Sequence, residues 1–157
     1  MATNVKPITE GMEGVIPYLS CKNAAEMLDF YRRAFGAVEL RRMPGPGGKV
    51  MHAEIKIGRV LIMLADEFAE MNFVSPATRG GPSVTLYIYV EDVDALARQA
   101  TAAGATLEGE VRNEFYGDRV ARLRDPSGHS WNFATHVEDV SDEELARRAA
   151  AMFGGGK

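Results

Sequence analysis

Val15-Ile-Pro-Tyr-Leu19, a short apolar run, opens a series of signals that the chain gives twice. Each copy has an apolar strand, a capped helix that ends at a glycine, and two further strands around a glycine turn. The copies extend from Val15 to Leu64 and from Val84 to Phe133. The second copy's signals are Val84-Thr-Leu-Tyr-Ile-Tyr-Val90, Asp92, Ala103-Gly-Ala105 and Gly128. Repeats of this size indicate one supersecondary unit used twice, with a ligand expected at the seam between the units.

Local patterns support the individual elements. Asn23 with Glu26 three residues later forms a capping box, and Gly36 predicts the left-handed cap that ends the first helix. Ser141-Asp-Glu-Glu144 is a second capping box and opens a C-terminal helix. Between them, Val50 to Ile57 alternates between apolar and polar residues, which predicts a strand with two unlike faces.

The fold class is therefore α+β, with two βαβββ modules whose curved mixed sheets enclose a cavity, plus a C-terminal helix. The expected segments are a flexible lead-in (1–11), the first module (12–66), a linker (67–82), the second module (83–140), the C-terminal helix (141–153) and a flexible tail (154–157).

Composition excludes several classes of protein. The chain of 157 residues has 46% hydrophobic and 25% charged residues, as soluble domains do. Its net charge of −4 and lack of basic clusters argue against a nucleic-acid partner. Neither a membrane span nor a signal peptide is visible, so we expect residence in the cytoplasm. The single cysteine, Cys21, excludes an intrachain disulfide and is expected to be a small buried residue.

The quoted residues also resemble a known family. Asn23-Ala-Ala-Glu-Met-Leu-Asp-Phe-Tyr-Arg-Arg-Ala-Phe-Gly-Ala37 is similar to the first module of the vicinal oxygen chelate superfamily, which includes glyoxalase I, extradiol dioxygenases and bleomycin-resistance proteins. Three further stretches resemble the second module of the superfamily, and more narrowly its PhnB-type branch. They are Tyr116-Gly-Asp-Arg119, Asp125-Pro-Ser-Gly-His-Ser-Trp131 and Ala134-Thr-His136. Met51-His-Ala-Glu-Ile55 also fits that branch. The resemblance implies paired βαβββ modules and a homodimer.

The resemblance does not carry the superfamily's usual metal site. Its metal enzymes place His or Gln in the first strand of each module and Glu in the last. The matching positions here hold Ile16, Ile62, Thr85 and Asn132. An alignment shifted by one residue offers Pro17, Met63, Leu86 or Phe133 instead. Because such sites need imidazole or carboxylate donors, we expect no metal and no other cofactor. An unusual metal site at His52, Glu54 and His129 stays open as an alternative.

His52 and Glu54 are the candidate catalytic residues. They lie two apart on one predicted strand, so their Cβ atoms share a face at about 6–7 Å. His52 is suited to act as a general base and Glu54 to orient it or accept its proton. The alternative is a strand face that only meets water. His129 is expected in a surface turn, and His136 in a capping or dimer contact.

Aromatic and polar side chains supply the candidate ligand-binding residues. Thr85, Tyr87 and Tyr89 alternate with apolar residues on one predicted strand, so one of the two sets faces the concave side. Such a wall suits a flat ligand through stacking. The expected ligand-binding residues are Tyr18, Thr85, Tyr87, Trp131 and Asn132. The alternative for Trp131 is a place in the core.

Three functions remain open from the sequence. The first is a metal-free protein that binds a small aromatic or peptide-like molecule, in the manner of the bleomycin-resistance branch. The second is a lyase or isomerase that uses His52 and Glu54 for acid–base chemistry. The third is a partner-binding or structural role in which the cavity is vestigial.

Overall fold

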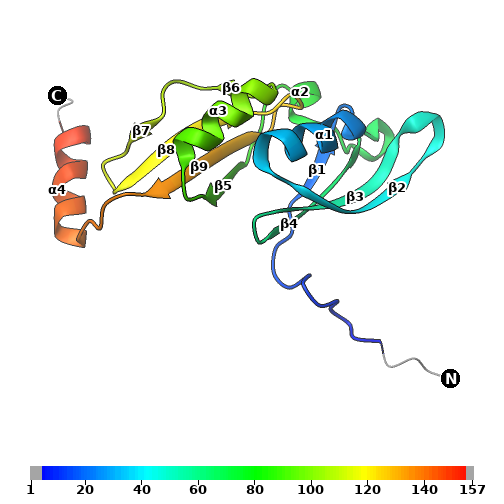
Figure 1. Cartoon of the computed structure of the whole chain (residues 1–157), viewed down its shortest axis with the longest axis horizontal. Coiled ribbons are helices and arrows are strands. Elements are labelled where there is room, and N and C mark those ends of the chain that lie inside the picture. The colour runs from blue at the N-terminus through cyan, green and yellow to red at the C-terminus, as the bar shows by residue number, and fades with distance from the viewer. Residues whose placement is uncertain (1–4, 155–157) are drawn as a thin grey trace. The chain divides into compact units, whose positions relative to one another are not determined.

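The computed structural model describes residues 5–154 and divides into two compact units, Met1–Gly81 and Pro82–Lys157 (Figure 1). The first four residues of the expected lead-in and the last three of the expected tail lie outside the described residues. Each unit contains one mixed sheet and one long helix packed on it, so the two are described separately.

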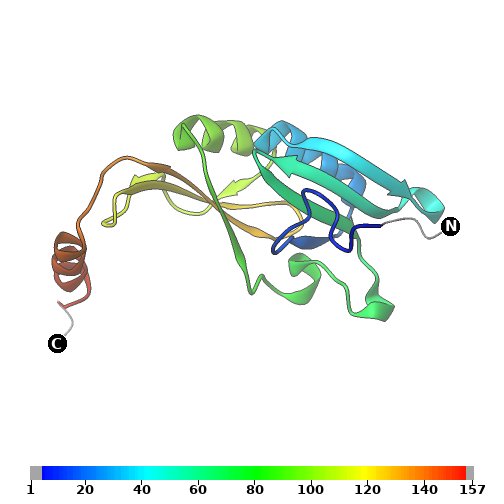
Figure 2. The same cartoon turned by 90° about the horizontal axis from the view of Figure 1, so that it is seen from below.

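The first unit has the predicted βαβββ order. Its elements are β1 (Tyr18–Cys21), α1 (Ala24–Phe35), β2 (Val38–Pro44), β3 (Val50–Ile57) and β4 (Val60–Asp66). The strand order across the sheet is β1-β4-β3-β2, with β1 parallel to β4 and the other pairs antiparallel. Helix α1 packs on one face of this sheet (Figure 2).

Strand β1 begins later than the sequence predicts. The expected strand started at Val15, whose side chain is 97% exposed, whereas the first paired residue is Tyr18. Pro17 explains the shift, because it has no N–H to donate to a neighbouring strand and joins the sheet only through its carbonyl oxygen, which accepts from the Met63 amide at 2.9 Å.

Helix α1 begins and ends as predicted. The Asn23 side chain accepts from the Glu26 amide, and Gly36 closes the helix at a φ of 65°. The buried Asp66 carboxylate at the end of β4 accepts from the amides of Ala24 and Val50, at 2.9 and 2.6 Å. This one side chain therefore ties the start of the helix to the start of β3.

The second unit repeats the plan with one strand broken in two. Its elements are β5 (Thr85–Tyr89), α3 (Val93–Ala103), β6 (Thr106–Leu107), β7 (Arg112–Asn113), β8 (Asp118–Arg124), β9 (Ser130–His136) and α4 (Asp142–Phe153). The sheet order is β5-β9-β8-β6, and β7 pairs with β8 further along that strand. The second strand of the expected module is thus the pair β6 and β7 with a loop between them.

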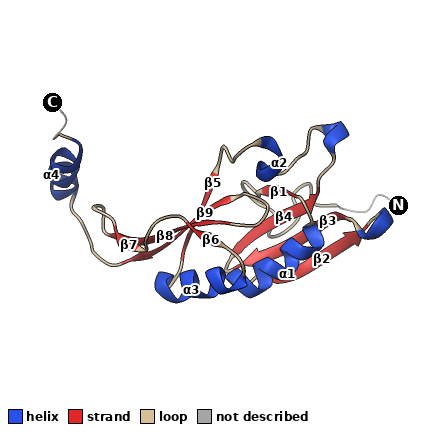
Figure 3. Cartoon of the chain, turned by 90° about the horizontal axis from the view of Figure 1, so that it is seen from above, coloured by secondary structure: helices blue, strands red, loops and turns tan. Residues whose placement is uncertain are grey.

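The side of the second sheet that faces α3 is apolar. Trp131 and Phe133 of β9 are fully buried and stack with their ring centroids 6.1 Å apart. Figure 3 shows α3 along one face of the sheet. The buried residues of this helix are Val93, Ala97 and Ala100. These small helix residues leave room for the large indole, which is why the helix and the sheet can pack closely.

Helix α4 follows β9 after a short connection that needs a glycine at position 117. The Gly117 carbonyl accepts from the amides of Val137 and Glu138, and a Cβ added at Gly117 would collide with the Glu138 carbonyl oxygen. Arg148 then holds α4 to the rest of the unit by an ion pair to Glu138 and a hydrogen bond to the Phe115 carbonyl.

Short helical turns fill the remaining connections. They are η1 (Pro46–Gly48), η2 (Ala69–Met71) and α2 (Pro76–Arg79), of which the last two lie in the segment expected as a plain linker. None of the helices in the described part of the chain has the length and hydropathy that a membrane span requires.

Candidate functional site

The side of the first sheet that faces away from α1 carries polar groups. We call Tyr18, His52, Glu54 and Met63 the first polar face. Tyr18 pairs with Met63, and Met63 pairs with Glu54, so the three side chains form one row across β1, β4 and β3. The neighbours of Glu54 along β3, Ala53 and Ile55, point to the apolar side and are buried. The predicted two-faced strand is confirmed.

A chain of hydrogen bonds joins three residues of this face. The Tyr18 hydroxyl lies 3.0 Å from His52 Nδ1, and His52 Nε2 lies 3.2 Å from Glu54 Oε1. The sequence placed His52 and Glu54 together; the contact of Tyr18 with His52 comes from a strand 34 residues away and was not foreseen.

The polar partners fix the tautomer of His52. An ionised carboxylate only accepts hydrogen bonds, so the Glu54 contact places the imidazole proton on Nε2. Nδ1 of the neutral ring is then an acceptor, and the Tyr18 hydroxyl donates to it. The Glu54 side chain is only 9% exposed and that of His52 21%, so this face is not a freely solvated strand surface.

Tyr18 is the exposed end of the chain. The residue is 47% exposed. Its ring forms T-shaped contacts with the rings of His52 and Phe73, with centroid distances of 5.5 and 5.3 Å. Partial burial raises the pKa of the Tyr18 hydroxyl, which therefore stays protonated at neutral pH. A ligand that reaches this face would meet that hydroxyl first.

The corresponding side of the second sheet carries a different set of groups. We call Tyr87, Tyr89, Asn132 and Arg122 the second polar face. Tyr87 pairs with Asn132, and Asn132 pairs with Arg122, so these three form a row across β5, β9 and β8. Thr85 lies on the same side, and its hydroxyl donates to Ser130 Oγ at 3.2 Å. Three predicted ligand-binding residues, Thr85, Tyr87 and Asn132, are thus brought together.

An acidic cluster lies at the end of this face towards α4. His136 Nδ1 lies 2.8 Å from Asp118 Oδ1, and His136 Nε2 lies 3.0 Å from Asp139 Oδ1. The Tyr89 hydroxyl donates to the other Asp118 oxygen. The hydrogen bonds to Asp139 and Asp118 raise the pKa of His136. His136 thus joins β9 to the connection that leads to α4, as a capping residue does.

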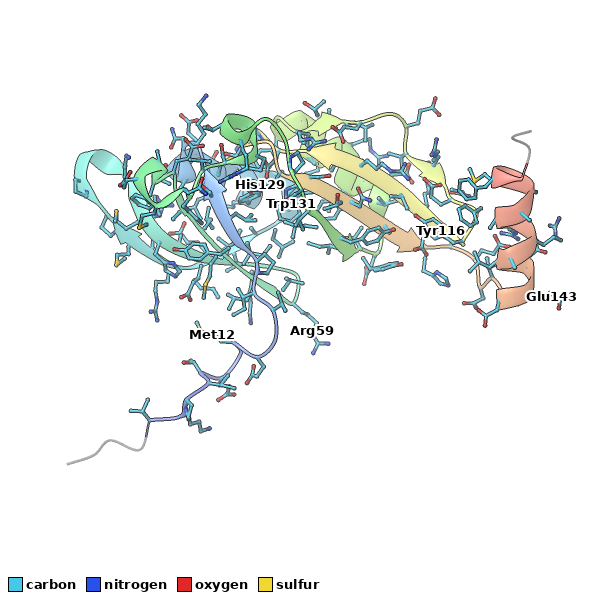
Figure 4. All side chains as sticks on the ribbon, turned by 180° about the vertical axis from the view of Figure 1, so that it is seen from behind. Met12, Arg59, Tyr116, His129, Trp131 and Glu143 are labelled. Carbon is cyan, nitrogen blue, oxygen red and sulfur yellow. The ribbon has the colours of Figure 1, made fainter. Side chains whose placement is uncertain are left out.

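Trp131 lies on the opposite side of the sheet from Tyr87 and Asn132. It is fully buried against α3, and its Nε1 donates to Asp125 Oδ2 at 2.9 Å. Figure 4 shows Trp131 beside His129 at one end of the sheet and Tyr116 near α4 at the other. The predicted turn at Asp125 is present, but the His129 side chain in it is buried rather than on the surface. Trp131 is therefore a core residue of this unit.

Asp125 explains why that turn is buried. Its Oδ1 accepts from the amides of Ser127 and His129, both at 3.0 Å, while Oδ2 accepts from Trp131. A carboxylate inside the turn thus satisfies groups that would otherwise be buried without partners. Cys21 is fully buried, as predicted for a small core residue.

The positions that correspond to the superfamily's metal ligands do not fit a metal. Ile62 is buried on the helix-facing side of the first sheet, and Met63, the residue of β4 on the polar face, offers only a weak thioether donor. Thr85 and Asn132 bring a hydroxyl and an amide. Within residues 5–154, no three or more His, Cys, Asp or Glu side chains form a group that could hold a metal ion. No metal-dependent step is derived for these residues.

The sequence missed Arg122, Asp118 and Glu114 of the second unit. Arg119, Arg122 and Arg124 place guanidinium groups on both sides of β8, so the alternation of the strand does not tell which of them faces the polar side. Only the pairing with Asn132 settles the position of Arg122.

Comparisons with known proteins agree with this architecture. An uncharacterised protein of Mycobacterium bovis is 38% identical over 148 residues, which cover 92% of this chain and 93% of the relative. The crystal structure of TioX from Micromonospora sp. superposes with a TM-score of 0.60 at 25% identity, over 79% of this chain and all of TioX. FosX of Listeria monocytogenes, a fosfomycin resistance protein solved with Mn(II), gives a TM-score of 0.61 over 87% of this chain and 98% of FosX; at 16% identity it shows the fold alone.

A family model covers both repeats. The Glyoxalase/Bleomycin resistance protein/Dioxygenase superfamily matches residues 15–133, which include the first sheet, most of the second sheet, and helices α1 and α3. Together with the repeated βαβββ order, this match identifies the chain as a member of the Glyoxalase/Bleomycin resistance protein/Dioxygenase superfamily.

Proposed function

We propose that this protein is an enzyme of the lyase or isomerase type that moves a proton on a small substrate. The observation that carries the proposal is the hydrogen-bond chain Tyr18–His52–Glu54 on the first polar face. A carboxylate, an imidazole and a hydroxyl in this order form the same kind of relay that activates hydroxyl groups in other enzymes. The geometry therefore favours the acid–base alternative over a protein that only binds.

The relay would work as follows. The substrate gives a proton to the Tyr18 oxygen while the original Tyr18 proton passes to His52 Nδ1. The resulting imidazolium lies between Tyr18 and the Glu54 carboxylate, whose charge stabilises it. In the return step Tyr18 gives its proton to another atom of the substrate or to a leaving group, and His52 Nδ1 gives its proton back to the Tyr18 oxygen, which completes an isomerisation or an elimination. An imidazole base suits the removal of a proton from a carbon beside a carbonyl group.

Burial supports a functional rather than a merely solvated cluster. An ionised carboxylate that is 9% exposed loses much of its hydration and needs a partner that donates to it. His52 is the hydrogen-bond partner that the structure gives Glu54. Buried ionisable side chains that contact one another in this way are common at functional sites.

The experiment is a screen for proton exchange. A panel of small aromatic ketones, hydroxyketones and keto acids is incubated with the protein in deuterated water, and NMR follows the loss of the C–H signal beside each carbonyl. We expect exchange of at least one compound to fall about 10²–10⁴-fold in His52→Ala. Lys56→Ala is the matched control, because Lys56 is exposed on the same strand and outside the relay. Exchange that is unchanged in His52→Ala contradicts the relay.

A second candidate function is the binding of a small aromatic or peptide-like molecule. The observation that favours it is the row Tyr87–Asn132–Arg122, in which a 42% exposed tyrosine ring lies beside an amide and a guanidinium group. The Tyr87 and Tyr89 ring centroids are 5.6 Å apart, so the two form a continuous aromatic surface. Tyr87→Ala should then weaken binding while His52→Ala leaves it nearly intact, as titration calorimetry would measure.

Four further proposals rest on the sequence, and the resemblance to the PhnB-type branch supports the first two of them. They are membership of that branch, a homodimer, residence in the cytoplasm, and activity without a metal or other cofactor. Light scattering after gel filtration tests the dimer, and elemental analysis with a titration of Zn²⁺, Ni²⁺, Mn²⁺ and Fe²⁺ into stripped protein tests the metal. Stoichiometric metal binding that disappears in His52→Ala would make His52 a ligand and would replace the relay.

A further inference from the structure

The second polar face combines an aromatic surface with an excess of positive charge. Tyr87, Asn132 and Arg122 lie on adjacent strands in direct register. Neighbouring strands are about 4.8 Å apart, so the row spans about 10 Å from the tyrosine to the arginine. That is the length of a small aromatic molecule with one polar substituent.

Two arginines share one carboxylate next to this row. Glu114 is 8% exposed, and its Oε1 accepts from Arg122 Nη2 at 2.6 Å and from Arg112 Nε at 3.1 Å. Burial by itself would raise the pKa of Glu114, but the hydrogen bonds from Arg122 and Arg112 hold it below its ordinary value. The group of three therefore carries a formal charge of +1 at neutral pH.

Arg122 is able to bind an anionic ligand while it stays in contact with Glu114. A guanidinium has five N–H donors in a planar fork, and the contact with Glu114 uses Nη2. The Arg122 side chain is 36% exposed on the side where Asn132 offers its amide. The fork of an arginine and a neighbouring amide match the two oxygens of a carboxylate.

The acidic cluster at the end of this face does not compete for the same ligand. Both carboxylate oxygens of Asp118 already accept hydrogen bonds, from His136 and from Tyr89. These two contacts offset part of the Asp118 charge, and an anionic ligand at Arg122 would displace neither of them. The distribution of charge therefore selects anions over cations along the row.

We propose that the second polar face binds an aromatic carboxylate, with its ring against Tyr87 and its carboxylate on Arg122 and Asn132. The proposal rests on the second candidate function above and names the chemical class of its ligand. Asn132 and Tyr87 hold the molecule in place, and Arg122 selects molecules that carry a negative charge.

The experiment compares two pairs of probes, benzoate with benzamide and phenylacetate with phenylacetamide. Each is titrated into the full chain labelled with ¹⁵N, and NMR shift changes give the affinity and the location. We expect each carboxylate to bind about tenfold or more tightly than its amide, with shifts at Tyr87, Asn132 and Arg122. In Arg122→Gln this preference disappears while the amide affinity stays the same. In Tyr87→Ala both affinities fall together.

Two further variants protect the test. Arg98→Gln removes the same charge from an exposed position of α3, which packs on the other side of the sheet, and should leave the preference unchanged. Arg122→Lys keeps the charge, keeps a partner for Glu114 and loses the planar fork, so it should retain only part of the preference.

The outcomes separate the two levels of the proposal. Equal affinity for carboxylate and amide, with shifts at Tyr87, overturns the anion preference and leaves the binding function. Shifts confined to the groove of about 410 Å³ between α3 and β6, which Leu107 and Val111 line, overturn the assignment of the site. No shift with any probe contradicts binding at this face altogether. A preference lost in Arg98→Gln as well as in Arg122→Gln contradicts the role of Arg122, because it reports either overall charge or an anion in the groove between α3 and β6, which Arg98 also lines.

Discussion

Across the first sheet, from its edge strand inward, the polar side presents Tyr18, Met63 and Glu54 in one row. Across the second sheet the corresponding strands present Tyr87, Asn132 and Arg122. Both rows begin with a partly exposed tyrosine and end with a charged residue, but the charge is negative in the first and positive in the second. His52 lies directly beside the first row, whereas His136 lies at the far end of the second face, in contact with Asp118.

The difference shows which side of each sheet the fold constrains. The helix-facing sides are alike because each must bury apolar area against a helix, and their residues are mostly apolar in both units. The polar sides carry no such requirement. One carries the hydrogen-bond chain Tyr18–His52–Glu54 and the other an aromatic surface with a guanidinium group, so the fold by itself names neither function.

Trp131→Ala should have the largest effect on stability. Trp131 is fully buried, stacks on Phe133 and donates to Asp125, so its removal leaves a cavity and a carboxylate that has lost a donor. We expect the free energy of unfolding to fall by about 3–5 kcal/mol, measured by urea denaturation followed by circular dichroism. Tyr87→Ala on the exposed side is the control and should change stability by about 0.5 kcal/mol or less. An equal loss in both variants would mean that the two sides of this sheet are not distinct.

His52→Ala should have the next largest effect, in the first unit. It leaves the buried Glu54 carboxylate without the imidazole that donates to it, which costs about 1–3 kcal/mol of unfolding free energy. The double variant His52→Ala/Glu54→Leu removes the unpaired charge and should recover part of that loss. If the double variant loses as much unfolding free energy as the two single variants together, or more, the two residues are not coupled. The carboxylate then has another partner, and the pair is not the unit proposed.

Much of this fold follows from local patterns. Asn23, Asp92 and Ser141 cap helices as predicted, because each side chain accepts from the amide three residues later. The alternation in β3 placed His52 and Glu54 on one side of the strand. The start of β1 was predicted three residues too early, because the apolar residues before Pro17 look like a strand but form no ladder.

The candidate sites were less predictable, because they depend on which strands become neighbours. No pattern around Tyr18 in the sequence predicts its contact with His52, and none around Asn132 predicts its pairing with Arg122. Each follows from the pairing of strands whose residues are ten or more positions apart in the chain. Trp131 looked like a binding residue because its type is common in ligand sites, while its side of the strand depends on the register of β9.

The smallest expected effect concerns pH and the histidine of the second unit. Hydrogen bonds to Asp139 and Asp118 raise the pKa of His136 above its ordinary value of 6.5. Its contribution to stability is therefore complete below pH 6.5 and is lost as the pH rises through the raised pKa. Fluorescence of Trp131, the single tryptophan, reports unfolding of the second unit, so urea midpoints at pH values from 6 to 9 measure this loss.

His136→Asn should remove the decline in stability above pH 6.5, because asparagine does not titrate in this range. Carboxylates act with the opposite sign: ion pairs with Arg147 and Arg148 lower the pKa of Glu144 to about 2, so the stability that it contributes is lost only in acid. A plot of urea midpoint against pH therefore separates the two contributions. Stability declines at alkaline pH because of His136 and at acid pH because of Glu144. If the alkaline decline persists in His136→Asn, a different group links the unfolding of this unit to pH, and the contact from β9 to Asp139 is no more than a surface hydrogen bond.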